Sequence, residues 1–242
     1  MEHFLKTSIQ KYFIAACTFF LWMSVFAVEL PTEELSKLAI GDIIFWAVQD
    51  AENRAGHVAV VVEAHDDSKW IRIAHATDHP AHNAFVITHI KTSKQLEKHQ
   101  RYYRVFRCKD TKIVHSFLGI IHGWLADKIP FNKVQERKMN QWDDATVKLS
   151  AEDKLQLQQA LYQKEFVTKE GLKNKVPTIP RRGLMCSDSI IVGLQAAYTE
   201  SIGAAALPLS LQLSALCPPS IFMFALIQDK NNFQELVAVK IL

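Results

Sequence analysis

Cys186 is the residue of this sequence best placed for nucleophilic chemistry. A thiol attacks a carbonyl group as the thiolate, so its pKa must be lowered. Cys186 lies where a basic, proline-containing loop (169–182) gives way to an apolar run with helical spacing (186–199). The N–H groups at a helix start favour the thiolate and can also stabilise an oxyanion. Arg181 and Arg182 lie just upstream. We therefore predict that Cys186 is a nucleophile.

The other three cysteines have weaker settings. Cys17 lies inside an N-terminal apolar run, Cys108 ends a probable strand, and Cys217 precedes two prolines. With the N-terminal run set aside, three cysteines remain, so at least one thiol has no disulfide partner within the chain. An odd thiol in an oxidising compartment is typical of a reactive or intermolecular role. Three inert buried thiols are the alternative.

A thiol nucleophile needs a base, usually histidine. His57 opens a strand-like run (56–62), and His75 belongs to the next one (70–76). If the turn between them centres near Asp66, opposed residues have numbers that sum to about 132, so His57 faces His75. The second histidine would then fix the tautomer of the first. A slip of one residue would move His75 to the other face, and a polar pair on a half-exposed sheet is the alternative interpretation.

Three neighbouring histidines, His75, His79 and His82, suggest a metal site at first sight. Their spacing runs into a loop that contains Pro80, so no single helix face presents them. No cysteine or carboxylate completes a tetrahedral set at a familiar spacing. We therefore expect surface histidines here, no bound metal and no cofactor.

The elements that position these residues change in character along the chain. Short β-prone runs come first, a helical stretch follows, and the cysteine-bearing helix and two further strands complete the chain. This order predicts an α+β fold in which a largely antiparallel sheet packs against helices, including the one that carries Cys186. The expected strands are 43–48, 56–62, 70–76, 84–90, 101–107, 220–227 and 233–241, and the expected helices are 111–127, 151–167 and 186–199.

Composition limits the class of protein. The chain has 242 residues, of which 49% are hydrophobic and 22% charged, which is enough apolar surface to bury a core. The net charge of +3 is spread along the chain and gives no concentrated basic face for nucleic acid. It supports at most a mild attraction to anionic surfaces, such as a peripheral membrane contact.

The first residues have the pattern of an export signal. Lys6 and Lys11 precede an uncharged apolar run (13–26), and small or branched residues follow up to Ala27. The run is too short to span a bilayer comfortably. We expect a signal peptide over 1–27, a single domain over 28–242, and a periplasmic or secreted protein. An uncleaved N-terminal anchor is the alternative.

Three short motifs resemble those of a known family. The sequences GDIIF (41–45) and GHVAVV (56–61) are similar to the strand motifs of the NlpC/P60 papain-like superfamily. In its ordinary members the cysteine helix precedes the histidine strand, whereas here MCSDS (185–189) comes later. That order resembles the permuted branch, which includes the YiiX-like proteins and the lecithin:retinol acyltransferase relatives. The resemblance covers residues 38–108 and 180–242.

The resemblance implies a circularly permuted papain-like domain with Cys186 as nucleophile, His57 as base and His75 as the third polar residue. It implies hydrolysis of amide bonds through a thioester, with cell-wall peptide or another extracytoplasmic acyl compound as substrate. Two alternatives stay open: an acyltransferase or lipase that acts on lipids, and a papain-like scaffold that binds without catalysis. The helical stretch 111–170 has no counterpart in the family pattern, and we expect it to be an insertion that covers the active-site cleft.

Overall fold

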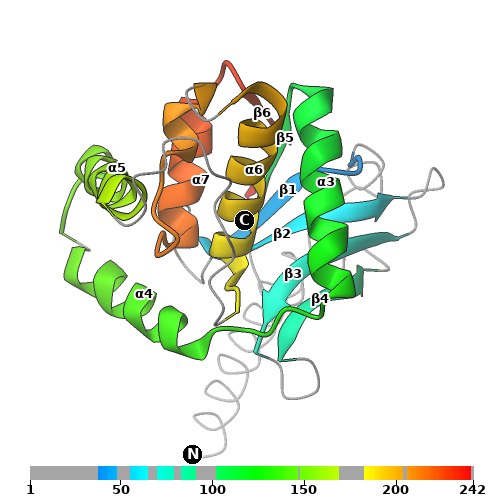
Figure 1. Cartoon of the computed structure of the whole chain (residues 1–242), viewed down its shortest axis with the longest axis horizontal. Helices are drawn as coiled ribbons and strands as arrows, with labels where there is room; N and C mark the ends of the chain where they lie inside the picture. The colour runs from blue at the N-terminus through cyan, green and yellow to red at the C-terminus, as the bar shows by residue number, and fades with distance from the viewer. Residues whose placement is uncertain are drawn as a thin grey trace, which may run out of the picture.

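A computed structural model shows how most of the chain folds (Figure 1). The expected signal peptide (1–27), the basic loop (169–182), His79 and His82 lie outside the described residues, so the predictions made for them stay predictions. In the part of the chain that is described, no helix combines the length and the apolar character that a membrane span needs. The structure describes residues 38–47, 55–64, 70–78, 83–90, 102–146, 148–168, 183–203 and 206–240.

Six strands form one sheet in the order β4-β3-β2-β1-β5-β6. Every neighbouring pair is antiparallel, which confirms the expected α+β fold with an antiparallel sheet. The last strand of the chain joins the sheet beside β5, so the two ends of the sequence contribute to one layer. The strands are β1 (Ile43–Ala47), β2 (Ala55–Ala64), β3 (Ile71–Thr77), β4 (Ala84–Ile90), β5 (Tyr102–Cys108) and β6 (Phe233–Lys240).

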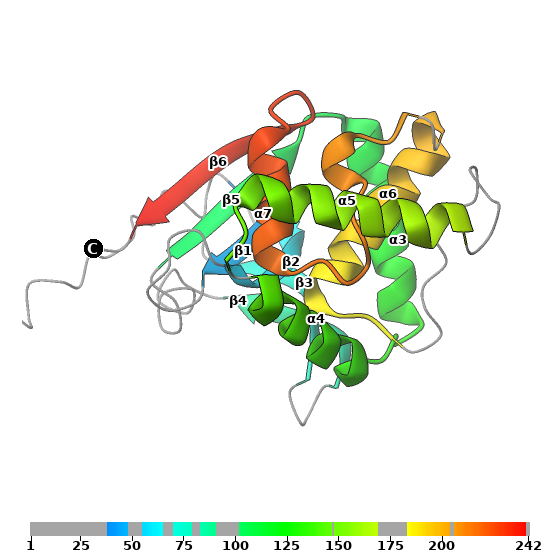
Figure 2. The same ribbon diagram turned by 90° about the vertical axis from the view of Figure 1, so that its left-hand side faces the viewer.

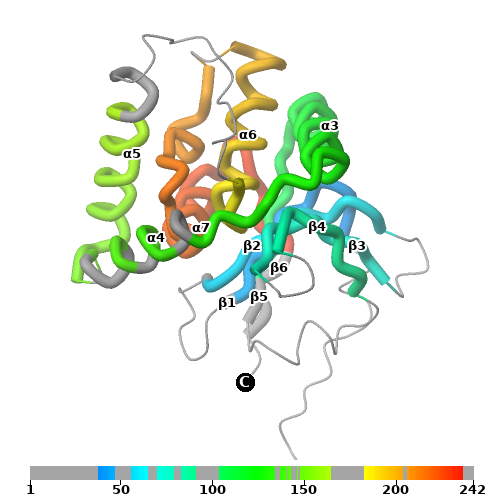
Figure 3. The backbone as a smooth tube through the Cα atoms, turned by 60° about the horizontal axis from the view of Figure 1, so that its bottom comes forward, coloured from blue at the N-terminus to red at the C-terminus, as the bar shows by residue number. Residues whose placement is uncertain are grey.

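The described helices lie on one side of this sheet (Figure 3). Three of them, α3, α6 and α7, contribute buried residues to the core that covers the sheet. The other two, α4 and α5, lie farther out, and α5 packs against α7 (Figure 2). The helices are α3 (Thr111–Ala126), α4 (Lys133–Thr146), α5 (Ala151–Thr168), α6 (Cys186–Ile202) and α7 (Pro219–Gln228), with a 3-10 turn η3 at Leu209–Leu211.

Both faces of the sheet are apolar. Successive side chains of a strand point to opposite faces. In β2, Val58 and Val60 belong to the core shared with α3, α6 and α7. Ala59 and Val61 belong to a second cluster, with Leu38, on the other face. The position of a side chain along β2 therefore decides whether it meets the helices.

The first helix of the expected insertion is part of the main core. α3 buries Ile113, Phe117, Ile121 and Trp124 against the sheet and α6. Gly193 on α6 makes the close approach possible, because a Cβ at this position would lie 2.7 Å from Cε2 of Phe117. α3 is thus a structural layer rather than a cover.

One expected element is wrong. Residues 220–227 form no strand but most of helix α7. The run is apolar throughout, because the helix buries residues on several sides, and such a run has no period that separates a buried strand from a buried helix. The overlooked signal was Pro219, which occupies a first-turn position where proline is favoured. A turn follows the helix, in which Asn232 donates its backbone N–H to the side chain of Asp229.

A partly buried ion pair joins the start of β1 to the end of β5. The carboxylate of Asp42 is fully buried and accepts hydrogen bonds from Nε and Nη2 of Arg107, each at 2.7 Å. It also accepts from the backbone N–H of Ala39 at 2.7 Å. The hydrogen bond and attraction of Asp42 raise the pKa of Arg107 against the opposing effect of burial. Asp42, part of the first family-like motif, is therefore structural.

Candidate functional site

Two histidines meet on the sheet. Nε2 of His57 in β2 lies 2.9 Å from Nδ1 of His75 in β3, and the two rings are perpendicular. Nε2 of His75 lies 2.8 Å from Oγ1 of Thr88 in β4. Three neighbouring strands thus build one hydrogen-bonded chain. The predicted contact between His57 and His75 is confirmed, whereas their catalytic role stays a prediction.

The register behind that contact differs from the expected one. The sequence arithmetic placed Val61 opposite Ile71, but Val61 pairs with Ile73. The pair numbers sum to 134 up to Val61 and to 135 from Glu63 onward, across an irregularity between these two residues. A shift of two residues keeps every side chain on its face. Continued from the last recorded pair, the register makes His57 and His75 diagonal neighbours, which long side chains can bridge.

Burial keeps both histidines neutral. Burial, together with a smaller effect of the neighbouring His75, lowers the pKa of His57 to about 3. Burial alone lowers the pKa of His75 to about 4. Trp46, which pairs with His57 across β1 and β2, packs its ring against the imidazole at 5.5 Å between centroids. At neutral pH each ring therefore has one donor and one acceptor nitrogen.

Because both rings are neutral, the hydrogen bonds of the His57–His75–Thr88 chain can run in either of two directions. In one, His57 donates from Nε2 to His75, and His75 donates from Nε2 to Thr88. Nδ1 of His57 is then an acceptor, which is what a base needs. In the other, Thr88 donates to His75 and His75 donates to His57, which leaves His57 with a protonated Nδ1. Only the first direction provides a basic nitrogen.

Cys186 is the first residue of α6, as predicted. The preceding Met185 has an extended backbone and its side chain makes no capping hydrogen bond. The first-turn N–H groups of a helix have no partner within the helix itself, so the sulfur lies where negative charge is favoured. Gly183 shapes the approach to the helix, because its φ of +99° is unfavourable for any other residue.

The surroundings of Cys186 are mostly closed. The residue is 8% exposed, and the next residue, Ser187, donates its hydroxyl to the carbonyl of Cys217 at 2.7 Å. Asp188, two residues on, is fully buried in the same helical turn. The expected cations Arg181 and Arg182 lie outside the described residues.

Cys186 and the histidines lie at one end of the sheet but on opposite faces. α6 begins near the end where β2 starts and β3 finishes (Figure 1). Cys186 belongs to the core that contains Val58, whereas His57 pairs with Trp46, a member of the cluster on the other face. In β3, the neighbours Ala74 and Ala76 belong to the core on the helix side, so His75 between them points to the other face. The predicted trio is thus only partly assembled: among the described residues, the hydrogen-bonded group contains His57 and His75 without Cys186.

Two members of this site were missed. Trp46 and Thr88 belong to expected strands, but neither was singled out. Trp46 would follow from extending the pairing of β2 to the strand before it. To predict Thr88, the pairing register of β3 with β4 would be needed. The sequence between these strands contains no recognisable turn that sets this register.

Compared with known proteins, the chain matches no protein-family profile, no curated sequence and no solved structure. The similarity of its motifs to the NlpC/P60 superfamily therefore rests on those motifs alone. Both the family and the permuted papain-like arrangement stay predictions.

The other two cysteines in the described part of the chain, Cys108 and Cys217, are buried parts of the core. Sγ of Cys108 lies 3.8 Å from the hydroxyl of Tyr198, and burial raises the pKa of this thiol. Cys217 is fully buried ahead of α7. Cys108, Cys186 and Cys217 are not joined to one another by disulfides. Within the described part of the chain, no three His, Cys, Asp or Glu side chains form a metal-binding group.

Proposed function

We propose that the protein is a cysteine hydrolase of the permuted papain-like type, with Cys186 as nucleophile and His57 as base. The observation that carries the proposal is the position of Cys186. It is the first residue of the buried helix α6, at the end of the sheet that holds the His57–His75–Thr88 chain. A thiol at a helix start and a neutral, oriented imidazole are the two parts that acyl transfer to sulfur requires.

The reaction has two halves. First, Nδ1 of His57 accepts the thiol proton, and Sγ of Cys186 bonds to the carbonyl carbon of an amide. First-turn N–H groups of α6 stabilise the oxyanion. His57 then donates the proton to the leaving nitrogen, the C–N bond breaks and a thioester remains. Second, His57 accepts a proton from water and the hydroxide attacks the thioester carbon. The C–S bond then breaks, His57 returns its proton to Sγ of Cys186, and the carboxylic acid leaves.

His75 and Thr88 are positioning residues in this scheme. Nδ1 of His75 accepts the hydrogen bond from Nε2–H of His57, and Nε2–H of His75 donates to Oγ1 of Thr88. This direction holds the tautomer with a basic Nδ1. Such an orienting partner is what a catalytic histidine generally needs.

The alternation of β2 sets one requirement. It directs the Cβ of His57 away from α6, so ring and sulfur meet only if the start of β2 turns His57 toward the helix. The recorded pairing of β2 with β3 covers Val60 to Ala64, which leaves His57 beyond the last ladder pair. On its other side His57 pairs with Trp46 of β1, next to an irregularity between Trp46 and Ala47, so this turn would have to open the β1 ladder at that point.

The substrate class follows from the expected export signal. An exported hydrolase meets extracytoplasmic peptides and acyl compounds, and cell-wall peptide is the class that we propose. Acyl transfer from lipids is the variant with the same covalent intermediate.

A binding protein without catalysis is the second candidate. It is favoured by one observation: Cys186 packs on the face of the sheet opposite His57. If this arrangement were permanent, the thiol would have no base and would serve packing alone.

Trapping of the thioester separates the two candidates. Purified protein is incubated with activated aryl esters and peptide anilides, and acyl adducts are located by peptide mass spectrometry. We expect a transient adduct on Cys186 that is lost in Cys186→Ala and forms and decays more slowly in His57→Gln. Cys108→Ala is the matched control and should behave as wild type. Turnover that survives in a folded Cys186→Ala protein would show that the proposed mechanism is wrong.

A further inference from the structure

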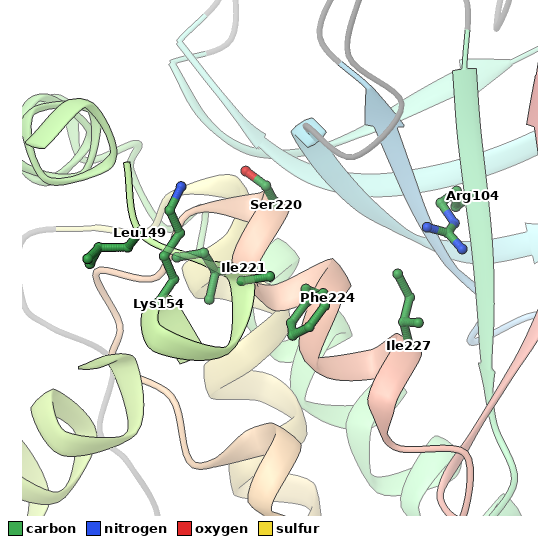
Figure 4. Close-up of a pocket in the computed structure, with 8 residues that line it drawn as sticks. Arg104, Leu149, Lys154, Ser220, Ile221, Phe224 and Ile227 are labelled. Atoms are coloured by element: carbon green, nitrogen blue, oxygen red, sulfur yellow. The ribbon is translucent and has the colours of Figure 1, made fainter. Parts of the chain in front are cut away.

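A pocket lies away from the histidines. It has a volume of about 440 Å³ and opens between the start of α5, one side of α7 and β5 (Figure 4). Sites for small organic ligands have volumes of roughly 300–1,000 Å³. The lining residues are Arg104, Leu149, Ala151, Lys154, Ser220, Ile221, Phe224 and Ile227.

The floor of the pocket is an apolar strip of α7. Ser220, Phe224 and Ile227 follow each other at helical spacing, and Ile221 lies beside them. At 1.5 Å per residue the strip is about 10 Å long. Leu149, which is 41% exposed, extends the apolar wall on the side of α5. A slender apolar body of comparable length fits along this strip.

The two cations of the pocket differ in their partners. Arg104 lies toward the Ile227 end, and its guanidinium is held by Glu235 through two hydrogen bonds of 2.6 and 2.9 Å (Figure 4). Lys154 lies near Ser220 at the other end (Figure 4). Among the described residues, no ion pair is formed by Lys154. The positive charge that a ligand can use is therefore at the Lys154 end.

The start of α5 strengthens this asymmetry. Ala151 and Lys154 belong to its first turn, where the helix dipole favours an anion. Two carboxylates, Glu152 and Asp153, are in the same turn but exposed, and Asp153 is bonded to the hydroxyl of Ser150. They weaken the field of the helix start without pairing with Lys154.

One buried amide of α5 has unmet hydrogen-bonding capacity but does not line the pocket. Gln158 lies one turn beyond Lys154 on α5 and is fully buried. Neither its amide nitrogen nor its oxygen has a hydrogen-bond partner among the described residues. Because Gln158 is not one of the lining residues, it offers no contact to a ligand in the pocket.

We propose that this pocket binds a small amphipathic carboxylate. The carboxylate pairs with Lys154, and Ser220 offers a hydroxyl donor beside it. The apolar body lies along Ile221, Phe224 and Ile227 toward Arg104. The site does not depend on the chemistry of Cys186, although the two are near neighbours through the hydrogen bond from Ser187 to Cys217, just before α7.

Calorimetric titration with decanoate tests the site, with 1-decanol and decylamine as probes that keep the chain and change the head group. We expect saturable binding of decanoate and binding of decanol and decylamine at least about tenfold weaker, a difference of 1.4 kcal/mol. Lys154→Gln should weaken decanoate by about the same factor and leave decanol unchanged. Lys112→Gln, which removes an exposed lysine of α3, should bind as wild type.

A blocking variant keeps the test independent of charge. Ala151 is exposed at the mouth of the pocket, so Ala151→Phe fills the space without disturbing the core. It should abolish saturable binding, whereas Ala126→Phe at the exposed end of α3 should not. Cys186→Ala should retain binding, which separates this proposal from the hydrolase. No saturable decanoate binding, equal binding of decanoate and decanol, or wild-type affinity in Ala151→Phe would each overturn the site.

Discussion

Nε2 of His57 and Nδ1 of His75 share one hydrogen bond of 2.9 Å between two strands of the sheet. A bond between two imidazole nitrogens exists only if one ring donates and the other accepts, so it requires the pair not to be doubly protonated. The low pKa values of both rings, about 3 and about 4, agree with that requirement. The pair therefore links the protonation of the protein to its stability.

Acid should destabilise the fold well above the range in which carboxylates titrate. In the unfolded chain both histidines bind protons below pH 6.5, whereas in the folded state they stay neutral down to about pH 4 and about pH 3. The unfolded state then binds more protons, so stability is complete above pH 6.5 and falls as the pH decreases. Each histidine contributes about 1.4 kcal/mol per pH unit in this range. Urea unfolding at several pH values measures the slope.

The matched variants assign that slope to the pair. His57→Gln and His75→Gln should each flatten the decrease between pH 6.5 and pH 4, whereas His115→Gln, at an exposed position of α3, should leave it unchanged. A slope of the same size in His57→Gln would mean that the histidine pair is not its source.

Removal of the Thr88 hydroxyl should allow the hydrogen bonds between His57 and His75 to run in either direction. Thr88→Val keeps the shape of the side chain but deletes the partner of His75 Nε2. We expect a loss of about 1 kcal/mol and a mixture of histidine tautomers, because nothing then fixes His75. Nitrogen NMR shifts of the imidazoles report the tautomers directly, and Thr88→Ser should restore the wild-type pattern. Unchanged shifts in Thr88→Val would contradict the positioning role.

Loss of Arg107 should be much more damaging than loss of another arginine in an ion pair. Arg107→Ala leaves the carboxylate of Asp42 fully buried without its partner, at a cost of about 3 kcal/mol or more. Arg72→Ala breaks an ion pair with Glu63 in which both side chains are about 40% exposed, and should cost about 1 kcal/mol or less. Chemical unfolding of the two variants makes the comparison. Equal losses of unfolding free energy in the two variants would show that the ion pair of Asp42 with Arg107 does not stabilise the junction of β1 and β5.

Two glycines on neighbouring helices should respond oppositely to alanine. Gly193→Ala places a Cβ 2.7 Å from the ring of Phe117, and overpacking of this kind costs about 1–3 kcal/mol. Gly119→Ala in α3 meets no atom within 4 Å and should stabilise the protein by up to about 1 kcal/mol through helix propensity. Thermal unfolding measures both. A stabilised Gly193→Ala protein would mean that α3 and α6 are not in close contact there.

The sequence predicted the local elements well, because their signals are local. Alternating or β-branched runs predicted all six strands of the sheet, and the change from a proline-containing loop to an apolar run predicted the start of α6 at Cys186. The helix at 219–228 was missed because its apolar run carries no period. The contact between His57 and His75 was found despite a wrong register, since an error of two residues preserves the face.

Local sequence patterns could not predict whether Cys186 and His57 lie on the same face of the sheet. Alternation along β2 groups His57 with Ala59 and Val61, and Val58 with Val60. It does not say which group the helices cover, because both groups are apolar. That choice is made by tertiary packing of α3, α6 and α7. Only the structure shows that α6 covers the Val58 face.

The ionisation of the Cys186 thiol tests the central claim most directly. Alkylation of the native protein by iodoacetamide over a range of pH, with each cysteine quantified by mass spectrometry, gives the thiolate profile of Cys186. Cys108, whose pKa is raised by burial, is an internal reference in the same sample. We expect Cys186 to react with a midpoint below the ordinary thiol value of about 8.5, and the midpoint to rise by about one pH unit in His57→Gln. Superimposable profiles in wild type and His57→Gln, with a midpoint at or above that of an ordinary thiol, would contradict the claim that Cys186 and His57 act together.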